Sequence, residues 1–112
     1  GFDGCWKGQW RSETSGHDGH LRAIVTRSGD SDYSIRYYAL YGSKALPIPF
    51  EYTLDSVKVE REGDVFKVVG TIDMGLFGKY SYDGKCSGES YKSSYISEYD
   101  RGIFDLERTA AD

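Results

Sequence analysis

Residues Gly4-Cys5-Trp6-Lys7-Gly8-Gln9-Trp10-Arg11 alternate between two faces, and this alternation decides the fold class. The two tryptophans and the two glycines share one face, while the polar side chains and the cysteine share the other. Successive side chains of a β-strand point to opposite sides, so the pattern predicts a strand with one buried face. An amphipathic helix would instead repeat its apolar positions every three or four residues.

The same alternation recurs along the rest of the chain, with turn residues between the segments. The predicted inward faces are Leu21, Ala23 and Val25; Tyr33, Ile35, Tyr37, Ala39 and Tyr41; Phe50, Tyr52 and Leu54; Val57 and Val59; Phe66, Val68, Gly70 and Ile72; Tyr80, Tyr82, Gly84 and Cys86; Tyr91, Ser93 and Tyr95; and Phe104, Leu106 and Arg108. Near Ser56 the pattern slips by one residue, which predicts a bulge, a tight bend or an additional hairpin. Pro47 and Pro49 indicate a break before the strand that follows them.

These segments predict an all-β domain over residues 1–112, with eight strands, or nine if the chain turns back near Ser56. Fourteen glycines and two prolines suit short strands joined by tight turns. Strands joined in this way pair with their sequence neighbours, which favours an antiparallel up-and-down barrel whose closure removes the exposed edges. A β-sandwich of two sheets is the alternative architecture.

Charge and hydropathy exclude several classes of partner. The formal net charge is −4, and acidic and basic side chains are interspersed, so we expect no nucleic-acid partner and a soluble protein. No apolar run approaches the ~18 residues that a membrane-spanning helix needs. The chain begins with Gly1 rather than methionine, as it would after removal of a leader or trimming. The location is undetermined on these grounds, with an extracytoplasmic one slightly favoured.

The two cysteines are not expected to form a disulfide. Cys5 lies on the face opposite Trp6 and therefore outside the barrel, whereas Cys86 lies on an inward face. They also belong to the first and sixth predicted strands, and two strand spacings of ~4.8 Å already exceed the ~7 Å limit between bridged Cα atoms.

The segment Gly4-Cys5-Trp6 resembles the Gly-x-Trp signature in the first strand of lipocalins and other calycin barrels. In those barrels a basic residue of the last strand packs across the tryptophan, and Arg108 matches it here. The resemblance implies a calycin-like barrel with Trp6 buried at its base under the Arg108 cation. The length is closer to avidin-like barrels, although their biotin-contacting residues find no match. Nitrobindin-type haem barrels share the start through Gly8, but they need a late axial histidine and this chain has none after His20.

Catalytic and metal-binding motifs are weak. His17-Asp18-Gly19-His20 could supply metal ligands, but a solvated turn explains it better because no other histidine completes a site. Ser is abundant without a Gly-x-Ser-x-Gly elbow. Asp73 and Asp83 could meet across a hairpin as acid and base, although the alternation turns both toward solvent. No catalytic residue, metal or cofactor is therefore predicted.

Tyrosine is the most informative residue type, with ten in the chain. Eight are predicted to point inward: Tyr33, Tyr37, Tyr41, Tyr52, Tyr80, Tyr82, Tyr91 and Tyr95. A buried hydroxyl without a partner costs roughly 1–3 kcal/mol, so a dry core of phenols would be unfavourable. Either the hydroxyls near the rim reach water, or the barrel holds one small ligand. The candidate ligand-binding residues are Tyr37, Tyr41, Tyr52, Tyr80, Tyr82 and Tyr95.

Three functions follow as hypotheses. The first is a non-enzymatic binding module that takes a small, partly apolar ligand in a tyrosine-lined barrel mouth. The second is an interaction domain in which Ile24, Tyr38, Leu40 and Ile96 form an exposed patch for a protein, a sugar or a second copy, as in a homodimer. The third is an enzyme that uses the same pocket, and a buried acid or histidine at the mouth would indicate it.

Overall fold

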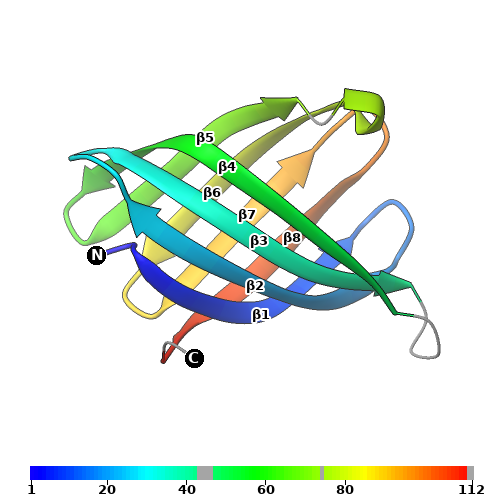
Figure 1. Cartoon of the computed structure of the whole chain (residues 1–112), viewed down its shortest axis with the longest axis horizontal. Helices are drawn as coiled ribbons and strands as arrows, with labels where there is room; N and C mark the ends of the chain where they lie inside the picture. The colour runs from blue at the N-terminus through cyan, green and yellow to red at the C-terminus, as the bar shows by residue number, and fades with distance from the viewer. Residues whose placement is uncertain (43–46, 74, 111–112) are drawn as a thin grey trace.

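The chain folds into a closed barrel of eight antiparallel strands, in which each strand pairs with the next and β8 pairs with β1 (Figure 1). The computed structural model describes residues 1–42, 47–73 and 75–110, without the side chains at 40–42, 47–48 and 77. The strands are β1 (Gly4–Ser12), β2 (Asp18–Arg27), β3 (Asp32–Gly42), β4 (Pro47–Glu62), β5 (Val65–Asp73), β6 (Lys79–Ser87), β7 (Ser90–Ile96) and β8 (Arg101–Thr109). The predicted up-and-down barrel is confirmed, and the sandwich alternative is wrong.

Short connections impose this order. Glu62 pairs directly with Val65, so only two residues separate β4 from β5. Gly63 adopts a φ of 59° there, a left-handed conformation that side chains with a Cβ rarely take. The longer connection from β5 to β6 contains one turn of 3₁₀-helix, η1 (Gly75–Phe77). Among the described residues no helix is long and apolar enough to cross a membrane.

The slip in the sequence pattern near Ser56 is a bulge within one strand. Tyr33 of β3 pairs with Val57, and Ile35 pairs with Leu54, so β4 carries one more residue than β3 between these pairs. The chain therefore does not turn back, and no ninth strand forms there. The extra residue lets Leu54 and Val57, three positions apart, both be buried.

The prolines do not break the chain before β4, because the strand begins at Pro47. β4 pairs with β3 from Pro47 to Lys58, but with β5 only from Val59 to Glu62. Beyond that short ladder β4 and β5 diverge (Figure 1). Pro49 is tolerated because it has no β5 partner that would need its missing N–H. We call the unpaired boundary between the first part of β4 and β5 the β4–β5 seam.

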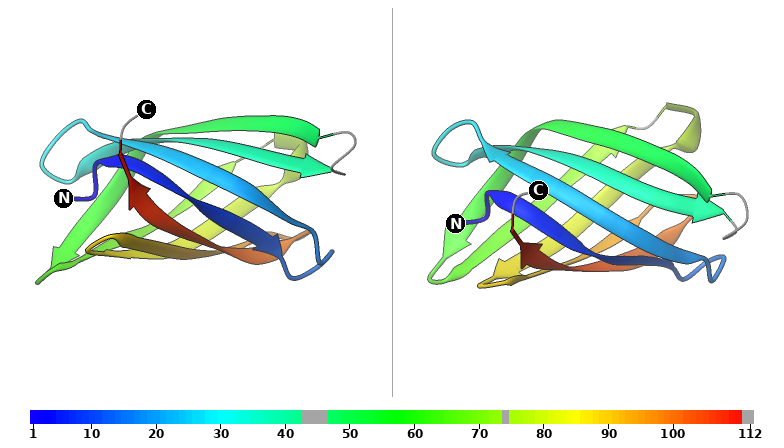
Figure 2. Two further views of the ribbon diagram at one scale, coloured as in Figure 1. Left: turned by 90° about the horizontal axis from the view of Figure 1, so that it is seen from below. Right: turned by 60° about the horizontal axis from the view of Figure 1, so that its bottom comes forward.

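One end of the barrel, which we call the base, is filled by side chains. Phe2, Trp6 and Tyr91 are completely buried there, and the Phe2 and Tyr91 rings meet edge to face with centroids 4.8 Å apart. The Trp6 indole Nε1 donates a hydrogen bond of 3.0 Å to the Phe2 carbonyl. The first residues of the chain thus close the base, and the end of β8 lies beside the start of β1 there (Figure 2).

Arg108 stacks on the outer side of this base. Its guanidinium carbon lies 4.4 Å from the Trp6 ring centroid, which confirms the contact expected from the calycin resemblance. Arg108 Nη1 donates a 2.8 Å hydrogen bond to the Asp3 carbonyl, and Nη2 donates to the Gly1 carbonyl. Gly4 is required beside it: its φ is 129°, and a Cβ there would lie 2.7 Å from Arg108 Nη1.

Both cysteines are free, as predicted. Cys5 in β1 is partly exposed, whereas Cys86 in β6 belongs to the buried core. β1 pairs with β2 and β8, and β6 with β5 and β7, so no ladder brings the two thiols together.

Candidate ligand-binding site

A cavity of about 410 Å³ occupies the other end of the barrel, which we call the mouth. All eight strands contribute to it, together with the connection between β7 and β8. The described lining residues are Trp10, Leu21, Tyr37, Ala39, Phe50, Tyr52, Leu54, Ile72, Tyr80, Tyr82, Tyr95, Asp100 and Phe104. The wall is therefore mostly aromatic, with phenol hydroxyls, an indole N–H and one carboxyl group as its polar side-chain groups.

Five of the six tyrosines that the sequence indicated as ligand-binding candidates line this cavity: Tyr37, Tyr52, Tyr80, Tyr82 and Tyr95. The side chain of Tyr41 lies outside the described part of the structure. Tyr33 and Tyr91 also point inward, but they are buried in the base, with 4% and 0% of their surfaces exposed. Inward direction alone therefore does not distinguish the filled half of the barrel from the hollow half.

The boundary between the two halves is a layer of aromatic rings. The hydroxyls of Tyr37 and Tyr91 lie 3.0 Å apart and form a hydrogen bond. Phe104 meets both rings edge to face, at centroid distances of 5.6 Å and 5.5 Å. Burial raises the pKa of the Tyr37 and Tyr91 phenols, so both stay neutral at physiological pH.

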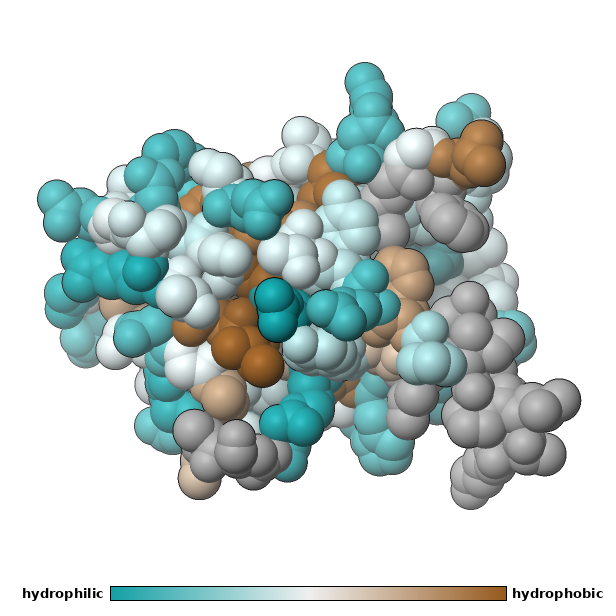
Figure 3. Space-filling view, in the orientation of Figure 1, coloured by the Kyte–Doolittle hydropathy of each residue, from teal (hydrophilic) through white to brown (hydrophobic). Residues whose placement is uncertain are grey.

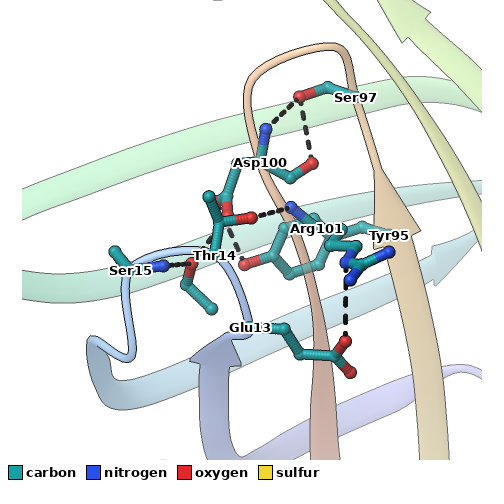
Figure 4. A network of polar contacts seen from close by, with 8 residues as sticks. Glu13, Thr14, Ser15, Tyr95, Ser97, Asp100 and Arg101 are labelled. Atoms are coloured by element: carbon teal, nitrogen blue, oxygen red, sulfur yellow. Dashed lines mark hydrogen bonds and ion pairs between the residues drawn. The ribbon is translucent and has the colours of Figure 1, made fainter.

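At the rim of the mouth, Asp100 joins the β7–β8 connection to the end of β1 (Figure 4). Its Oδ1 accepts a hydrogen bond of 2.6 Å from the buried Ser12 hydroxyl, and its Oδ2 accepts one of 3.3 Å from Tyr95. Ser97 holds the backbone of this connection, since its Oγ accepts from the Asp100 N–H at 3.0 Å.

This arrangement keeps Tyr95 neutral. Burial raises the pKa of the Tyr95 phenol, and Asp100 adds to the effect because a phenolate would place a second negative charge beside it. Tyr80 lies next to Tyr95 with its ring centroid 6.0 Å away. The rim therefore combines one carboxylate with two neighbouring aromatic rings.

Trp10 contributes the other unusual group. Its indole Nε1 is buried and has no hydrogen-bond partner, the one such side-chain nitrogen or oxygen among residues 1–42, 47–73 and 75–110 as described. A buried N–H without a partner costs roughly 1–3 kcal/mol. Trp10 lines the cavity through other atoms of its side chain, since this nitrogen is itself shielded from solvent.

Sequence reasoning missed Trp10 and Asp100 as site residues. The alternation did place Trp10 on the inward face with Trp6, and its distance along β1 from Trp6 was the signal that it belongs to a different layer. Asp100 carried no comparable signal, because it lies in a connection where alternation predicts nothing. Its place over the mouth depends on where β7 ends and β8 begins beside β1.

The other candidates from the sequence do not gather at this site. Asp73 pairs with Lys79 and Asp83 with Val69, so the two aspartates do not meet across the hairpin. His17 and His20 are exposed on the β1–β2 connection and the start of β2. In the described parts of the chain, no group of three or more potential metal ligands occurs.

The exposed patch suggested by the sequence is not continuous. Ile24 lies in β2 and Ile96 in β7, and β1 and β8 separate these strands. Ile24 and Tyr38 are only partly exposed, Ile96 is 54% exposed, and the Leu40 side chain is outside the description. On the face seen in Figure 3, hydrophobic residues form small separate groups between hydrophilic ones.

Comparison with known proteins supports the fold. No family model matches the chain, and no curated protein matches it. It is similar to a solved crystal structure of a mutant of the fluorescent protein UnaG, with a TM-score of 0.54 and 12% sequence identity over 98% of this chain and 97% of that chain. This similarity and the closed eight-stranded barrel together show a calycin-like fold.

Proposed function

We propose that the protein binds one small, partly apolar ligand in the cavity at the mouth. The observation that carries the proposal is the division of the barrel: the base is filled to full burial, whereas the mouth holds about 410 Å³ lined by aromatic rings. Small-molecule sites are concave, mostly apolar, of roughly 300–1,000 Å³, and carry a few placed polar groups. The cavity has each of these properties.

An enzyme that uses this cavity is the second candidate, because Asp100 is an acid at the mouth. Acid–base catalysis needs a partner group of matched pKa. The described lining holds no histidine, lysine, cysteine or second carboxyl group, and its remaining titratable groups are tyrosines. The pKa of Tyr37, Tyr82 and Tyr95 is raised by burial, away from the range useful near neutral pH. Binding without catalysis is therefore favoured.

The test is occupancy of the cavity by N-phenyl-1-naphthylamine, a neutral probe whose emission rises in apolar surroundings. We expect saturable binding at one site, together with a change in the tryptophan emission of the protein, to which Trp10 in the cavity wall contributes. Ala39→Trp fills the cavity from β3 and should weaken binding at least tenfold. Val69→Trp adds the same side chain on the outside of β5, where Val69 is 55% exposed, and should leave binding unchanged.

Two outcomes contradict the proposal. One is the absence of saturable binding to the unaltered protein. The other is equal affinity of the Ala39→Trp and Val69→Trp variants for the probe, which would place its binding site outside the cavity. Thermal unfolding of both variants verifies that each is folded at the temperature of the titration.

A further inference from the structure

We propose that the mouth selects organic cations, namely protonated amines with an aromatic or other apolar body, whose ammonium group binds at Asp100. This inference rests on the proposed function and names the ligand class of the same site. Two features of the cavity point to it: the charge of its lining, and the free acceptor positions of the Asp100 carboxylate beside the aromatic rings of Tyr95 and Tyr80.

The charge of the described lining is negative. Asp100 is its one carboxyl group, and no lysine, arginine or histidine stands among the described lining residues. Arg101 follows Asp100 in sequence, but its side chain is 67% exposed and lies 3.8 Å from Glu13 instead (Figure 4). A bound carboxylate or phosphate would therefore meet a like charge without a compensating cation, which disfavours anionic ligands.

The surroundings of Asp100 suit a cation. Each carboxylate oxygen accepts one hydroxyl hydrogen bond, from Ser12 or from Tyr95, and keeps a further acceptor site. An ammonium donor at that site would make a charge-assisted hydrogen bond, which is stronger than a neutral one. The Tyr95 hydroxyl contacts the carboxylate and the Tyr80 ring lies next to the Tyr95 ring, so a cation held at Asp100 would have two aromatic rings nearby.

The rest of the cavity suits the apolar body of the ligand. With the ammonium group at Asp100, that body would lie against rings such as Tyr37 and Phe104, which line the same cavity. The inferred ligand is thus an aromatic or apolar amine.

The experiment compares three probes that share one ring system and differ in charge: 2-naphthylmethylamine, 2-naphthalenemethanol and 2-naphthoate. Isothermal titration calorimetry at pH 7 with the unaltered protein should rank the amine about tenfold or more above the alcohol, and the carboxylate last. This ranking requires no variant. An amine that binds no more tightly than the alcohol, or a carboxylate that binds most tightly, would overturn the inference.

Substitutions test whether Asp100 causes the preference for the amine over the alcohol. Asp100→Asn removes the charge and should reduce the affinity for the amine to about that for the alcohol, while the alcohol itself is little affected. Asp83→Asn makes the same change on the exposed face of β6 and should keep the preference. A preference that survives in folded Asp100→Asn protein contradicts the assignment.

The two proposals fail separately. If the alcohol binds as well as the amine and Ala39→Trp weakens both, the mouth is a binding site but Asp100 does not select cations. If none of the naphthalenes and no N-phenyl-1-naphthylamine binds, the proposed function fails and the ligand class fails with it.

Discussion

Arg108 illustrates how one side chain can connect the two ends of the sequence. Its guanidinium covers the Trp6 ring, donates to the carbonyls of Asp3 and Gly1, and needs the space that Gly4 leaves by lacking a Cβ. The Gly-x-Trp pattern is thus a packing requirement: the glycine makes room for the cation that stacks on the tryptophan two residues later.

Replacement of Arg108 by alanine should destabilise the protein by about 1–2 kcal/mol, through loss of the cation–π contact and of the packing of the aliphatic stem. Urea unfolding followed by tryptophan fluorescence measures the change. Arg101→Ala is the matched control, because Arg101 makes an exposed ion pair with Glu13, and such pairs contribute roughly 0–1 kcal/mol. Equal losses for the two variants would show that the stacked position adds nothing.

The buried tyrosines predict a loss of stability in alkali. Burial raises the pKa of Tyr37, Tyr91 and Tyr95 in the folded protein above the ordinary value near 10. Above that pH the unfolded chain loses phenol protons that the folded chain retains, so the free energy of unfolding decreases as pH rises. The contribution of these tyrosines to the free energy of unfolding is fully present below about pH 10 and decreases progressively above that pH.

Urea unfolding at about pH 8 to 11, with tyrosinate absorbance recorded in parallel, measures this decrease. Tyr37→Phe should make the decline less steep, whereas Tyr99→Phe should not, because Tyr99 is 64% exposed. Tyrosinate absorbance that reaches its full amplitude while the barrel is still folded would contradict the expectation.

At the scale of elements, β4 is the strand that departs from regular pairing. It is 16 residues long, contains the bulge opposite Tyr33 and Ile35, and pairs with β5 only at Val59–Glu62. The bulge bends and twists the strand, and beyond it the first part of β4 follows β3 alone. The β4–β5 seam is therefore the place where the wall of the mouth has the fewest ladder hydrogen bonds.

Hydrogen exchange should reveal this seam. Amides of β4 between Pro49 and Ser56 have one neighbouring strand, whereas those of β2 from Leu21 to Val25 lie between β1 and β3. We expect the β4 segment to exchange faster on average, because local opening there breaks fewer contacts. Exchange followed by mass spectrometry on proteolytic fragments measures both segments in one experiment. Equal protection would show that the seam is closed in solution.

At the scale of the whole molecule, the barrel separates stability from binding. The completely buried aromatic side chains Phe2, Trp6 and Tyr91 gather at the base, while the mouth has partly exposed rings around a cavity. The Tyr37–Tyr91 hydrogen bond and Phe104 form the layer between these halves. A substitution in the base should therefore lower stability with little effect on ligand affinity, and a substitution in the mouth should weaken binding with little effect on stability.

Phe2→Ala tests this separation. Deletion of a buried phenylalanine ring costs about 3–5 kcal/mol, so the unfolding midpoint should fall sharply. The affinity for N-phenyl-1-naphthylamine, measured well below that midpoint, should stay the same. Ala39→Trp should show the reverse, with weakened binding and a smaller change in stability. Parallel loss of both properties in Phe2→Ala would mean that base and mouth form one coupled unit.

The sequence by itself determined the strands, their order and the inward faces. Alternation is a local property, and short turns leave sequence neighbours as the natural partners, so the barrel could be predicted before any contact was known. The irregularity near Ser56 was predictable for the same reason, and the contact of Arg108 with Trp6 followed from the calycin resemblance. Five of the six candidate tyrosines reached the cavity because each lies on an inward face.

Only the tertiary structure decided which inward residues fill the base and which surround a cavity. Tyr91 and Tyr95 share one face of β7, yet one is fully buried and the other lines the mouth. That difference depends on where each residue lies between the base and the mouth, and therefore on which side chains from strands remote in sequence surround it. Asp100 over the mouth and the unpaired N–H of Trp10 likewise result from packing between distant segments, which no local pattern records.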